Sequence, residues 1–68
     1  MKIFQIRLIE QRKLNNLTQR DVAKHLGITQ PSYIRYEKGD AEPSLFNLVK
    51  LADLFDVSVD FLLGRDDI

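Results

Sequence analysis

The sequence predicts an all-helical fold in which five short helices make one domain, residues 1–68. Two observations lead to this prediction. Apolar residues recur three and four positions apart along much of the chain, and this spacing places them on one face of a helix. Between these stretches lie serine, threonine, glycine and proline residues of the kinds that begin and end helices. The chain has no cysteine, so no disulfide framework supports the fold.

Single residues predict the ends of these helices. The helices are expected over residues 3–14, 19–26, 30–38, 45–55 and 59–63. N-cap side chains precede the last four of them, at Thr18, Thr29, Ser44 and Ser58. Asp21 follows Thr18 by three positions, as in a capping box, and Gly27 can adopt the positive φ that ends a helix. Residues 65–68 are expected to form a frayed tail.

The apolar faces of these helices are the predicted core. Phe4 and Leu8 share one face of the first helix, and Tyr33 and Tyr36 lie on the inward face of the third. The fourth helix carries the longest apolar stripe, which contains Leu45, Leu48, Leu51, Ala52 and Phe55. Outside the Phe4–Leu8 face lie further apolar residues that are either a contact surface or scattered exposed side chains: Ile6, Ile9 and Leu14.

Charge is distributed unevenly along the chain, although the net charge is zero. Residues 1–38 contain eight basic and three acidic residues, a net charge of +5. Residues 39–68 contain two basic and seven acidic residues, a net charge of −5. A polyanion such as a nucleic acid would prefer the first part. The alternative is that both parts are ordinary solvated surfaces.

Residues 18–38 have the features of a helix-turn-helix. Only Gly27 and Ile28 separate the second helix from the Thr29 cap of the third, so the two helices must meet at a steep angle. Ala23 is small enough for a close contact between them, and apolar side chains of both helices point toward a shared core. In such a unit the second of the two helices enters the major groove of DNA.

The chain also resembles a known family, the helix-turn-helix domain of phage repressors, Cro proteins and Xre-type bacterial regulators. The resemblance rests on short motifs in order: Leu17-Thr18-Gln19, Val22-Ala23, Leu26-Gly27-Ile28, Thr29-Gln30, Glu37-Lys38-Gly39, Pro43-Ser44-Leu45 and Val57-Ser58-Val59-Asp60-Phe61-Leu62-Leu63. It implies a lambda-repressor-like DNA-binding domain.

The resemblance assigns base-reading roles to one side of the third helix. The matching positions are Thr29, Gln30, Pro31, Ile34 and Arg35. Gln30 can pair with adenine, and Arg35 with guanine, through two hydrogen bonds each. Ile34 suits a thymine methyl group or is a tolerated surface hydrophobe. Pro31 offers shape and apolar contact but no side-chain hydrogen bond.

Contacts to DNA phosphates are expected from four residues: Thr18, Gln19, Ser32 and Lys38. Gln19 matches the family's phosphate-clamping position at a positive helix start, and the alternative is a surface glutamine. The loop after Gly39 is acidic here, with Asp40 and Glu42. Phosphate contacts near that loop must therefore come from Lys38 or from backbone N–H groups.

Arg12 and Glu37 match a family pair that joins the first helix to the end of the third by a salt bridge. Such a bridge would hold the recognition helix against the rest of the domain. The alternative is two unrelated surface charges. Gln11 stands where relatives carry an apolar core residue.

The sequence does not indicate an enzyme. His25 is the only histidine, and the serines fit caps or a first helical turn, so no Ser/His/Asp set and no metal-ligand spacing is present. We therefore expect no catalytic residue, metal, cofactor or small-molecule site. Apolar runs are only a few residues long, so no membrane span is expected, and the expected location is the cytoplasm.

The expected function is sequence-specific binding of double-stranded DNA by a small transcriptional regulator, a repressor, that acts as a homodimer on a palindromic operator. One short recognition helix reads few base pairs, and two copies on a palindrome read twice as many. The alternative is a protein-interaction module of the same fold, an antitoxin-like partner or an anti-repressor. The neutral net charge, the acidic loop and the additional apolar residues of the first helix favour that alternative.

Overall fold

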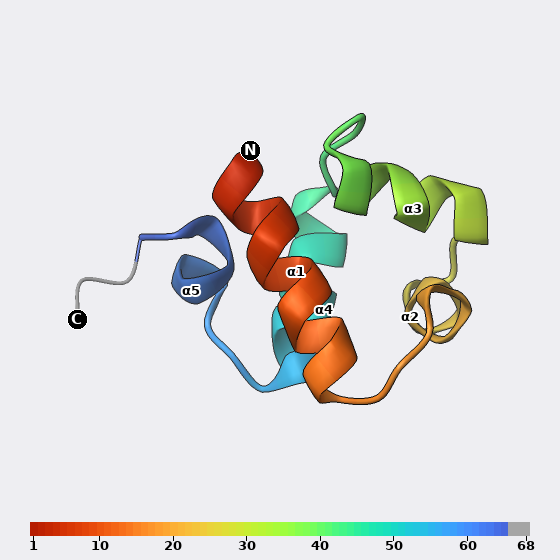
Figure 1. The fold of residues 1–68 in the computed structure, drawn as a ribbon, viewed down its shortest axis with the longest axis horizontal. Coiled ribbons are helices and arrows are strands. Elements are labelled where there is room, and N and C mark those ends of the chain that lie inside the picture. Colours follow the sequence, from red (N-terminus) through yellow and green to blue (C-terminus); the bar gives the residue numbers. More distant parts are fainter. Residues whose placement is uncertain (66–68) are drawn as a thin grey trace.

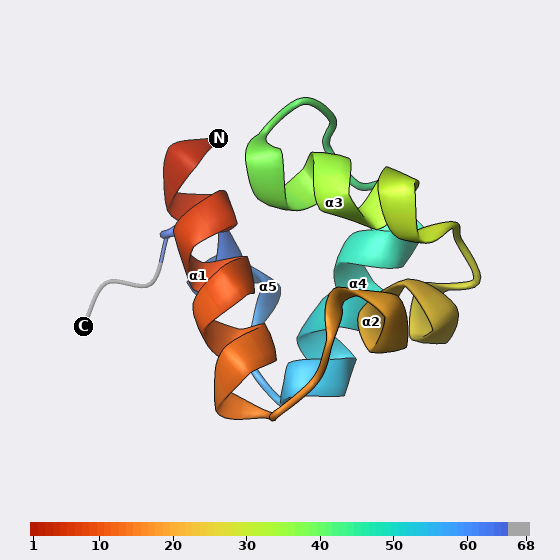
Figure 2. The same cartoon turned by 45° about the vertical axis from the view of Figure 1, so that its right-hand side comes forward.

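Five helices make up the secondary structure of residues 1–65, the part of the chain that the structure, a computed structural model, describes. They are α1 (Lys2–Leu14), α2 (Gln19–Leu26), α3 (Gln30–Lys38), α4 (Leu45–Phe55) and α5 (Val59–Leu63). These residues contain no strand, so the all-helical prediction is confirmed. In Figure 1, α4 lies behind α1, with α5 on one side and α2 and α3 on the other. In the turned view of Figure 2, α2 lies in front of α4.

The N-terminal caps form as the sequence predicts. The hydroxyl group of each capping residue accepts a hydrogen bond from the backbone N–H three residues later, at Thr18, Thr29, Ser44 and Ser58. Thr18 belongs to a complete capping box, because the Asp21 carboxylate accepts the Thr18 N–H at 2.8 Å. This bond to the Thr18 backbone holds the pKa of Asp21 below its usual value.

Residues in the left-handed conformation end four of the helices. Gly27 ends α2 with a φ of 72°, as expected, whereas α4 ends at Asp56, whose φ is 55° without a glycine. Asp56 can adopt this conformation because its short polar side chain tolerates it. Beyond the end of α5, the Arg65 N–H bonds to the Asp60 carbonyl at 2.8 Å, so Arg65 does not begin a frayed tail. Residues 66–68 of the predicted tail lie outside the described residues.

The core is a cluster of buried side chains to which all five helices contribute. It contains Phe4, Leu8, Val22, Ala23, Leu26, Tyr33, Tyr36, Leu48, Leu51, Ala52, Phe55 and Leu62. In this packing α2 lies against α3, α1 contacts both α3 and α5, and α4 contacts α5 and α2. Because α3 packs on both α1 and α2, its position is set by two helices that come before it in the chain.

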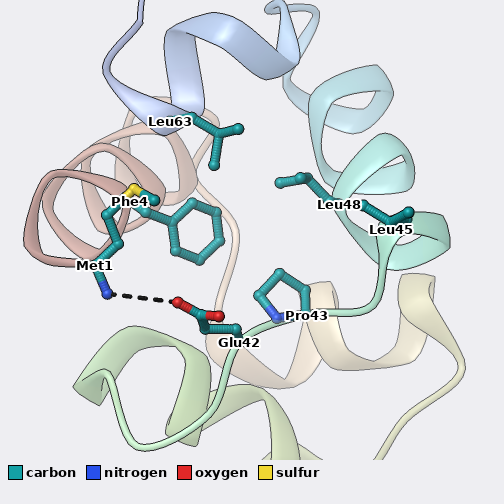
Figure 3. A pocket seen from close by; sticks show the side chains of 7 residues that line it. All are labelled: Met1, Phe4, Glu42, Pro43, Leu45, Leu48 and Leu63. Atoms are coloured by element: carbon teal, nitrogen blue, oxygen red, sulfur yellow. Dashed lines mark ion pairs between the residues drawn. The ribbon is translucent and has the colours of Figure 1, made fainter.

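Leu45 was expected in the apolar stripe of α4, and this expectation is wrong, because the residue is 83% exposed. Leu45 shares a helix face with Leu48, but it lies in the first turn, where the neighbouring elements leave a hollow of about 170 Å³. The hollow is lined by Met1, Phe4, Glu42, Pro43, Leu45, Leu48 and Leu63 (Figure 3). Phe46 and Val49 are also exposed, so the start of α4 presents an apolar surface to solvent.

Arg7 joins α1 to α5. Its guanidinium lies 4.3 Å from the ring centre of Phe61, and its Nη1 donates a hydrogen bond to the Phe61 carbonyl. The contact connects residues far apart in the sequence. It also places one basic residue of the positively charged part of the chain in an internal contact.

Candidate nucleic-acid interface

The turn between α2 and α3 has the short connection that the sequence predicts. The Ile28 N–H bonds to the Ala23 carbonyl at 3.0 Å, and the Gly27 N–H bonds to the Lys24 carbonyl at 3.1 Å. Ala23 is only 2% exposed and belongs to the core cluster, and Ile28 packs against that core. In Figure 1, α2 is seen nearly end-on while α3 runs across the picture, so the two helices cross steeply.

One side of α3 faces the core and the other faces solvent. Tyr33, Tyr36 and Glu37 are buried, whereas Pro31 and Arg35 are exposed. Gln30 and Ile34 are half-buried at the edge between the two sides, and Thr29, Ser32 and Lys38 are exposed. The structure therefore places Pro31 and Arg35 on the exposed side of α3, Gln30 and Ile34 beside them and less exposed, and Thr29 at the N-cap.

The start of α3 is organised by Thr29 and Ser32. The Thr29 Oγ1 accepts the Ser32 N–H at 3.3 Å and donates its own hydrogen to the Ser32 Oγ at 2.9 Å. The hydroxyl hydrogen of Thr29 is thus used within the cap. The hydroxyl hydrogen of Ser32 remains available to an acceptor outside the protein, such as a phosphate oxygen.

The far end of α3 is covered by the loop that follows it. The Asp40 N–H bonds to the Arg35 carbonyl at 2.9 Å, and the Arg35 Nη2 lies 3.4 Å from the Asp40 carbonyl oxygen. The second contact is long for a hydrogen bond. The Arg35 side chain therefore rests against the loop through a weak contact that another acceptor can replace.

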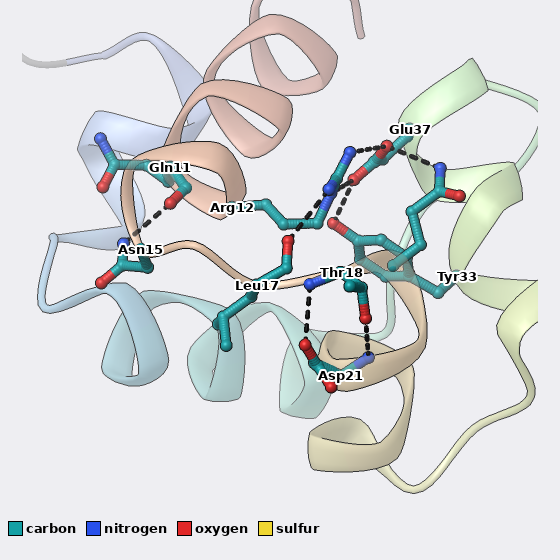
Figure 4. A network of polar contacts seen from close by, with 9 residues as sticks. Gln11, Arg12, Asn15, Leu17, Thr18, Asp21, Tyr33 and Glu37 are labelled. Carbon is teal, nitrogen blue, oxygen red and sulfur yellow. Dashed lines mark hydrogen bonds and ion pairs between the residues drawn. The ribbon is translucent and has the colours of Figure 1, made fainter.

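Glu37 connects α1, α2 and α3 through one carboxylate (Figure 4). Its Oε2 lies 2.6 Å from the Arg12 Nε and accepts a hydrogen bond from the Tyr33 hydroxyl. Its Oε1 accepts hydrogen bonds from the Gln19 Nε2 at 3.0 Å and from the Arg12 Nη2 at 3.3 Å. The Arg12 Nη1 donates to the Leu17 carbonyl at 3.1 Å. The structure thus brings Arg12 and Glu37 together. Their ion pair ties α3 to α1, and the hydrogen bond from Gln19 ties α3 to α2.

The pKa values of this network keep its charges in place. Burial raises the pKa of Glu37, but hydrogen bonds from Arg12, Tyr33 and Gln19 outweigh burial and leave that pKa below its usual value. The hydrogen bond to Glu37 raises the pKa of Arg12. Burial, followed by the hydrogen bond to Glu37, raises the pKa of the Tyr33 hydroxyl. At neutral pH, Glu37 is an acceptor and its three partners are donors.

Gln5 supports the same end of α3 from α1. Its Nε2 lies 3.4 Å from the Glu37 carbonyl oxygen. Its amide also lies close to Gly39, and a Cβ added at Gly39 would come within 2.6 Å of the Gln5 Oε1. Gly39 has a φ of 81°, so the position suits glycine both for its backbone conformation and for the close approach of Gln5.

The start of α2 differs in detail from the arrangement expected of a phosphate clamp. The Gln19 amide is directed to Glu37, and the Thr18 hydroxyl accepts the Asp21 N–H at 3.0 Å. Both side chains therefore already have partners within the protein. The first backbone N–H groups of a helix have no intrahelical acceptor, so those of Gln19 and Arg20 are the groups that could meet an anion here.

Arg20 is a residue of this surface that the sequence reasoning missed. Its Nε lies 3.4 Å from the Gln30 Oε1, so it joins the start of α2 to the start of α3. Both residues line an open concavity of about 750 Å³, together with Arg12, Leu17, Thr18 and Gln19. A signal was present in the sequence, because Arg20 is a basic residue in the first turn of a helix beside Gln19.

Two classes of site are not found in the described part of the chain. Within residues 1–65, no group of three or more histidine, cysteine, aspartate or glutamate side chains could hold a metal ion. Among the same residues, each helix is too short or too polar to cross a membrane.

Similar proteins carry the same unit. The chain is 48% identical to the transcriptional repressor RstR of cryptic phage CTXphi from Vibrio cholerae serotype O1, over 96% of this chain and 57% of RstR. It is 48% identical to the transcriptional regulator AnsR of Bacillus subtilis, over 88% of this chain and 52% of AnsR. An uncharacterized transcriptional regulator of Methanocaldococcus jannaschii is 44% identical, over 82% of this chain and 86% of that protein.

The chain spans about half the length of RstR and AnsR. No solved structure gives a significant match to it. The model of the helix-turn-helix family matches residues 8–62. These residues include α2, α3, the turn between them and the Arg12–Glu37 pair. By this match and by its five-helix fold, the chain belongs to the helix-turn-helix family.

Proposed function

We propose that this chain binds double-stranded DNA in a sequence-specific manner, as the DNA-binding part of a small transcriptional repressor. The observation that carries the proposal is the orientation of α3. Pro31 and Arg35 face solvent on one side, while Tyr33 and Glu37 hold the other side against α1 and α2. A helix fixed in this way can enter the major groove without reorganising the rest of the domain.

The proposed contacts divide into two groups. Bases would be read by Thr29, Gln30, Pro31, Ile34 and Arg35, and phosphates would be contacted by Thr18, Gln19, Ser32 and Lys38. Ser32 and Lys38 are exposed and can use their side chains. Gln19 would act through its backbone N–H at the start of α2, while its amide donates one hydrogen to Glu37. Phosphate contacts would set the position of the domain on DNA, and base contacts would set its sequence preference.

The proposal includes the arrangement in which the chain acts. Residues 1–68 would form one domain, and two copies in the cytoplasm would bind the two halves of a palindromic operator. A recognition helix of nine residues contacts few base pairs, and pairing two of them raises specificity. The similarity to RstR, a transcriptional repressor, supports repression as the outcome of binding.

Selection of bound sequences from random DNA duplexes tests this proposal. We expect enrichment of a palindrome whose half-sites lie about one helical turn apart. Enrichment of one unpaired half-site would contradict the homodimer but keep sequence-specific binding. If the folded protein enriches no sequence, the proposal fails.

One observation favours a second function, a protein-interaction module of the same fold. Leu45, Phe46 and Val49 are 83%, 71% and 49% exposed, and they form an apolar surface at the start of α4. Such a surface can contact another protein. A Phe46→Ser variant separates the two functions. If the chain is an interaction module, Phe46→Ser should bind a protein partner more weakly than the unaltered chain does, and neither protein should enrich a DNA sequence. If the chain binds DNA as proposed, Phe46→Ser should enrich the same sequence as the unaltered chain.

A further inference from the structure

The contact between Arg20 and Gln30 changes what the Gln30 side chain can offer to a base. The Arg20 Nε donates to the Gln30 Oε1 across the interface of α2 and α3, at 3.4 Å. The amide oxygen of Gln30 is therefore on the side of the guanidinium, and its NH₂ group is on the other side. The bond is as long as the Arg35–Asp40 contact, so it orients the amide through the attraction of the cationic guanidinium for the amide oxygen rather than through a strong hydrogen bond.

A glutamine without such a partner pairs with adenine through two hydrogen bonds. Its oxygen accepts from the adenine N6 amino group, and its NH₂ donates to N7. Here the oxygen of Gln30 lies beside the cationic side chain of Arg20. A second lone pair remains on that oxygen, but an amino group that approached it would bring its partial positive charge toward the same guanidinium. The Arg20 contact therefore weakens the Gln30 Oε1 as an acceptor for the adenine N6 amino group, the interaction that selects adenine.

The pair instead presents hydrogen-bond donors. Gln30 retains its NH₂ group, and the exposed guanidinium of Arg20 has N–H groups on its two Nη atoms. In the major groove guanine offers two adjacent acceptors, O6 and N7, whereas adenine offers one acceptor beside a donor. A surface made only of donors matches guanine better.

We infer that Arg20 is a positioning residue for base recognition, and that the Arg20–Gln30 pair makes the base contacted by Gln30 a guanine in preference to adenine. This inference rests on the proposed DNA-binding function and refines it. Gln30 is the contacting residue, and Arg20 acts through it by orienting its amide.

Lys24→Ala is a matched control for Arg20→Ala. Lys24 lies on the same helix one turn later, is exposed, and carries the same charge. Both basic side chains act on Asp21 through their charges. Removing either one lowers the positive charge of α2 equally, but only Arg20 contacts Gln30.

The test measures competition binding against single-base variants of the sequence that the unaltered chain selects. The base pair read by Gln30 is the position of the selected sequence at which Gln30→Ala no longer distinguishes between bases. At that position we expect the unaltered chain to favour guanine over adenine by at least about fivefold. Arg20→Ala should shift this ratio toward adenine by a similar factor, because the amide oxygen is released. Lys24→Ala should weaken binding to all variants alike.

A double substitution makes the role of Gln30 in this effect explicit. In a Gln30→Ala background, Arg20→Ala should leave the ratio of guanine to adenine binding unchanged. Thermal melting of each variant checks that the domain stays folded, as expected for the exposed Arg20 and Lys24.

Two results would overturn the inference while leaving the proposed function intact. One is that Arg20→Ala weakens binding to every variant by the same factor, as Lys24→Ala does. The other is that the unaltered chain prefers adenine at the Gln30 position. A chain that selects no sequence at all would instead contradict the proposed function itself.

Discussion

Arg12 of α1 and Glu37 of α3 form an ion pair in which the Arg12 Nε lies 2.6 Å from the Glu37 Oε2, and their side chains are 13% and 6% exposed. Buried charges of this kind need partners, because the interior solvates them poorly. Glu37 has three partners on its two oxygens: Arg12, Tyr33 and Gln19. The orientation of the candidate recognition helix therefore depends on a buried carboxylate.

Glu37→Gln should destabilise the domain by about 3–5 kcal/mol, because it leaves the charge of Arg12 buried without its counter-ion. Urea denaturation measures the change in the free energy of unfolding. Glu10→Gln, at an exposed position of α1, is the control and should change it by less than about 0.5 kcal/mol. Arg12→Met combined with Glu37→Gln should be more stable than Glu37→Gln alone. If the double variant is the less stable one, the cost does not come from an unpaired Arg12.

Acid should destabilise the domain partly through Glu37. The folded-state pKa of Glu37 lies below its usual value of 4.5, so at moderately acidic pH the unfolded chain binds the extra proton. The contribution to stability is present above the unfolded pKa and is lost as pH falls through the folded pKa. Urea titrations between about pH 6 and pH 3 should show the free energy of unfolding decreasing, less steeply in Glu37→Gln. If the free energy of unfolding falls equally steeply with pH in both proteins, the acid sensitivity comes from other carboxylates, such as Asp21, whose pKa is also lowered.

Gly27→Val should destabilise the domain through backbone strain alone. Gly27 has a φ of 72°, which a β-branched residue adopts only at a cost of about 1–2 kcal/mol, and a Cβ at this position would meet no atom within 4 Å. Thermal melting should show a decrease of several degrees, roughly 4–8 °C per kcal/mol. Gly27→Asn is the control and should lose less stability, because asparagine tolerates the left-handed conformation. Equal losses for both variants would argue against strain as the cause.

Arg35→Ala should cost roughly 1–3 kcal/mol of binding free energy on the preferred sequence and relax the preference at one base pair per half-site. To reach a base, the Arg35 side chain has to give up only its contact with the Asp40 carbonyl, which is weak because it is 3.4 Å long. Lys13→Ala should leave the relative preferences unchanged, because Lys13 lies outside α3. Competition binding against single-base variants compares the two. An equal loss on all variants for Arg35→Ala would make Arg35 a phosphate contact and leave base reading to the other four proposed residues.

Raising the salt concentration should weaken DNA binding. Each phosphate that the protein neutralises contributes about −0.9 to the slope of log K against log salt. Lys38→Ala should reduce the steepness of this slope by about one, if the exposed Lys38 contacts a phosphate. Gel shifts at several salt concentrations measure both slopes. Affinity that does not change with salt would contradict a contact with the DNA backbone.

The sequence by itself determined the helices and their ends. A cap such as Thr18 or Thr29 bonds to an N–H three residues away, and a left-handed Gly27 closes its helix with bonds to the preceding turn. These interactions lie within a few residues, so the order of amino acids is enough to predict them. The inward position of Tyr33 and Tyr36 follows in the same way from the helical period.

The family resemblance also predicted one long-range contact, the pair of Arg12 and Glu37. Matching motifs indicate which residues are paired in the family, whereas helical periodicity indicates only which residues share a face. It did not supply two other contacts between helices. Gln19 bonds to Glu37, and Arg20 bonds to Gln30, although the residues of each pair are 18 and 10 positions apart.

Only the tertiary structure decided those partners and the exposure of Leu45. Helical periodicity predicts which side chains share a face, but a face is buried only where another element covers it. At the first turn of α4 the neighbouring elements leave a hollow, so Leu45 remains exposed, whereas Leu48 on the same face is buried. The distance between side chains on different helices depends on how those helices pack, and that packing is a property of the whole core rather than of any local stretch of sequence.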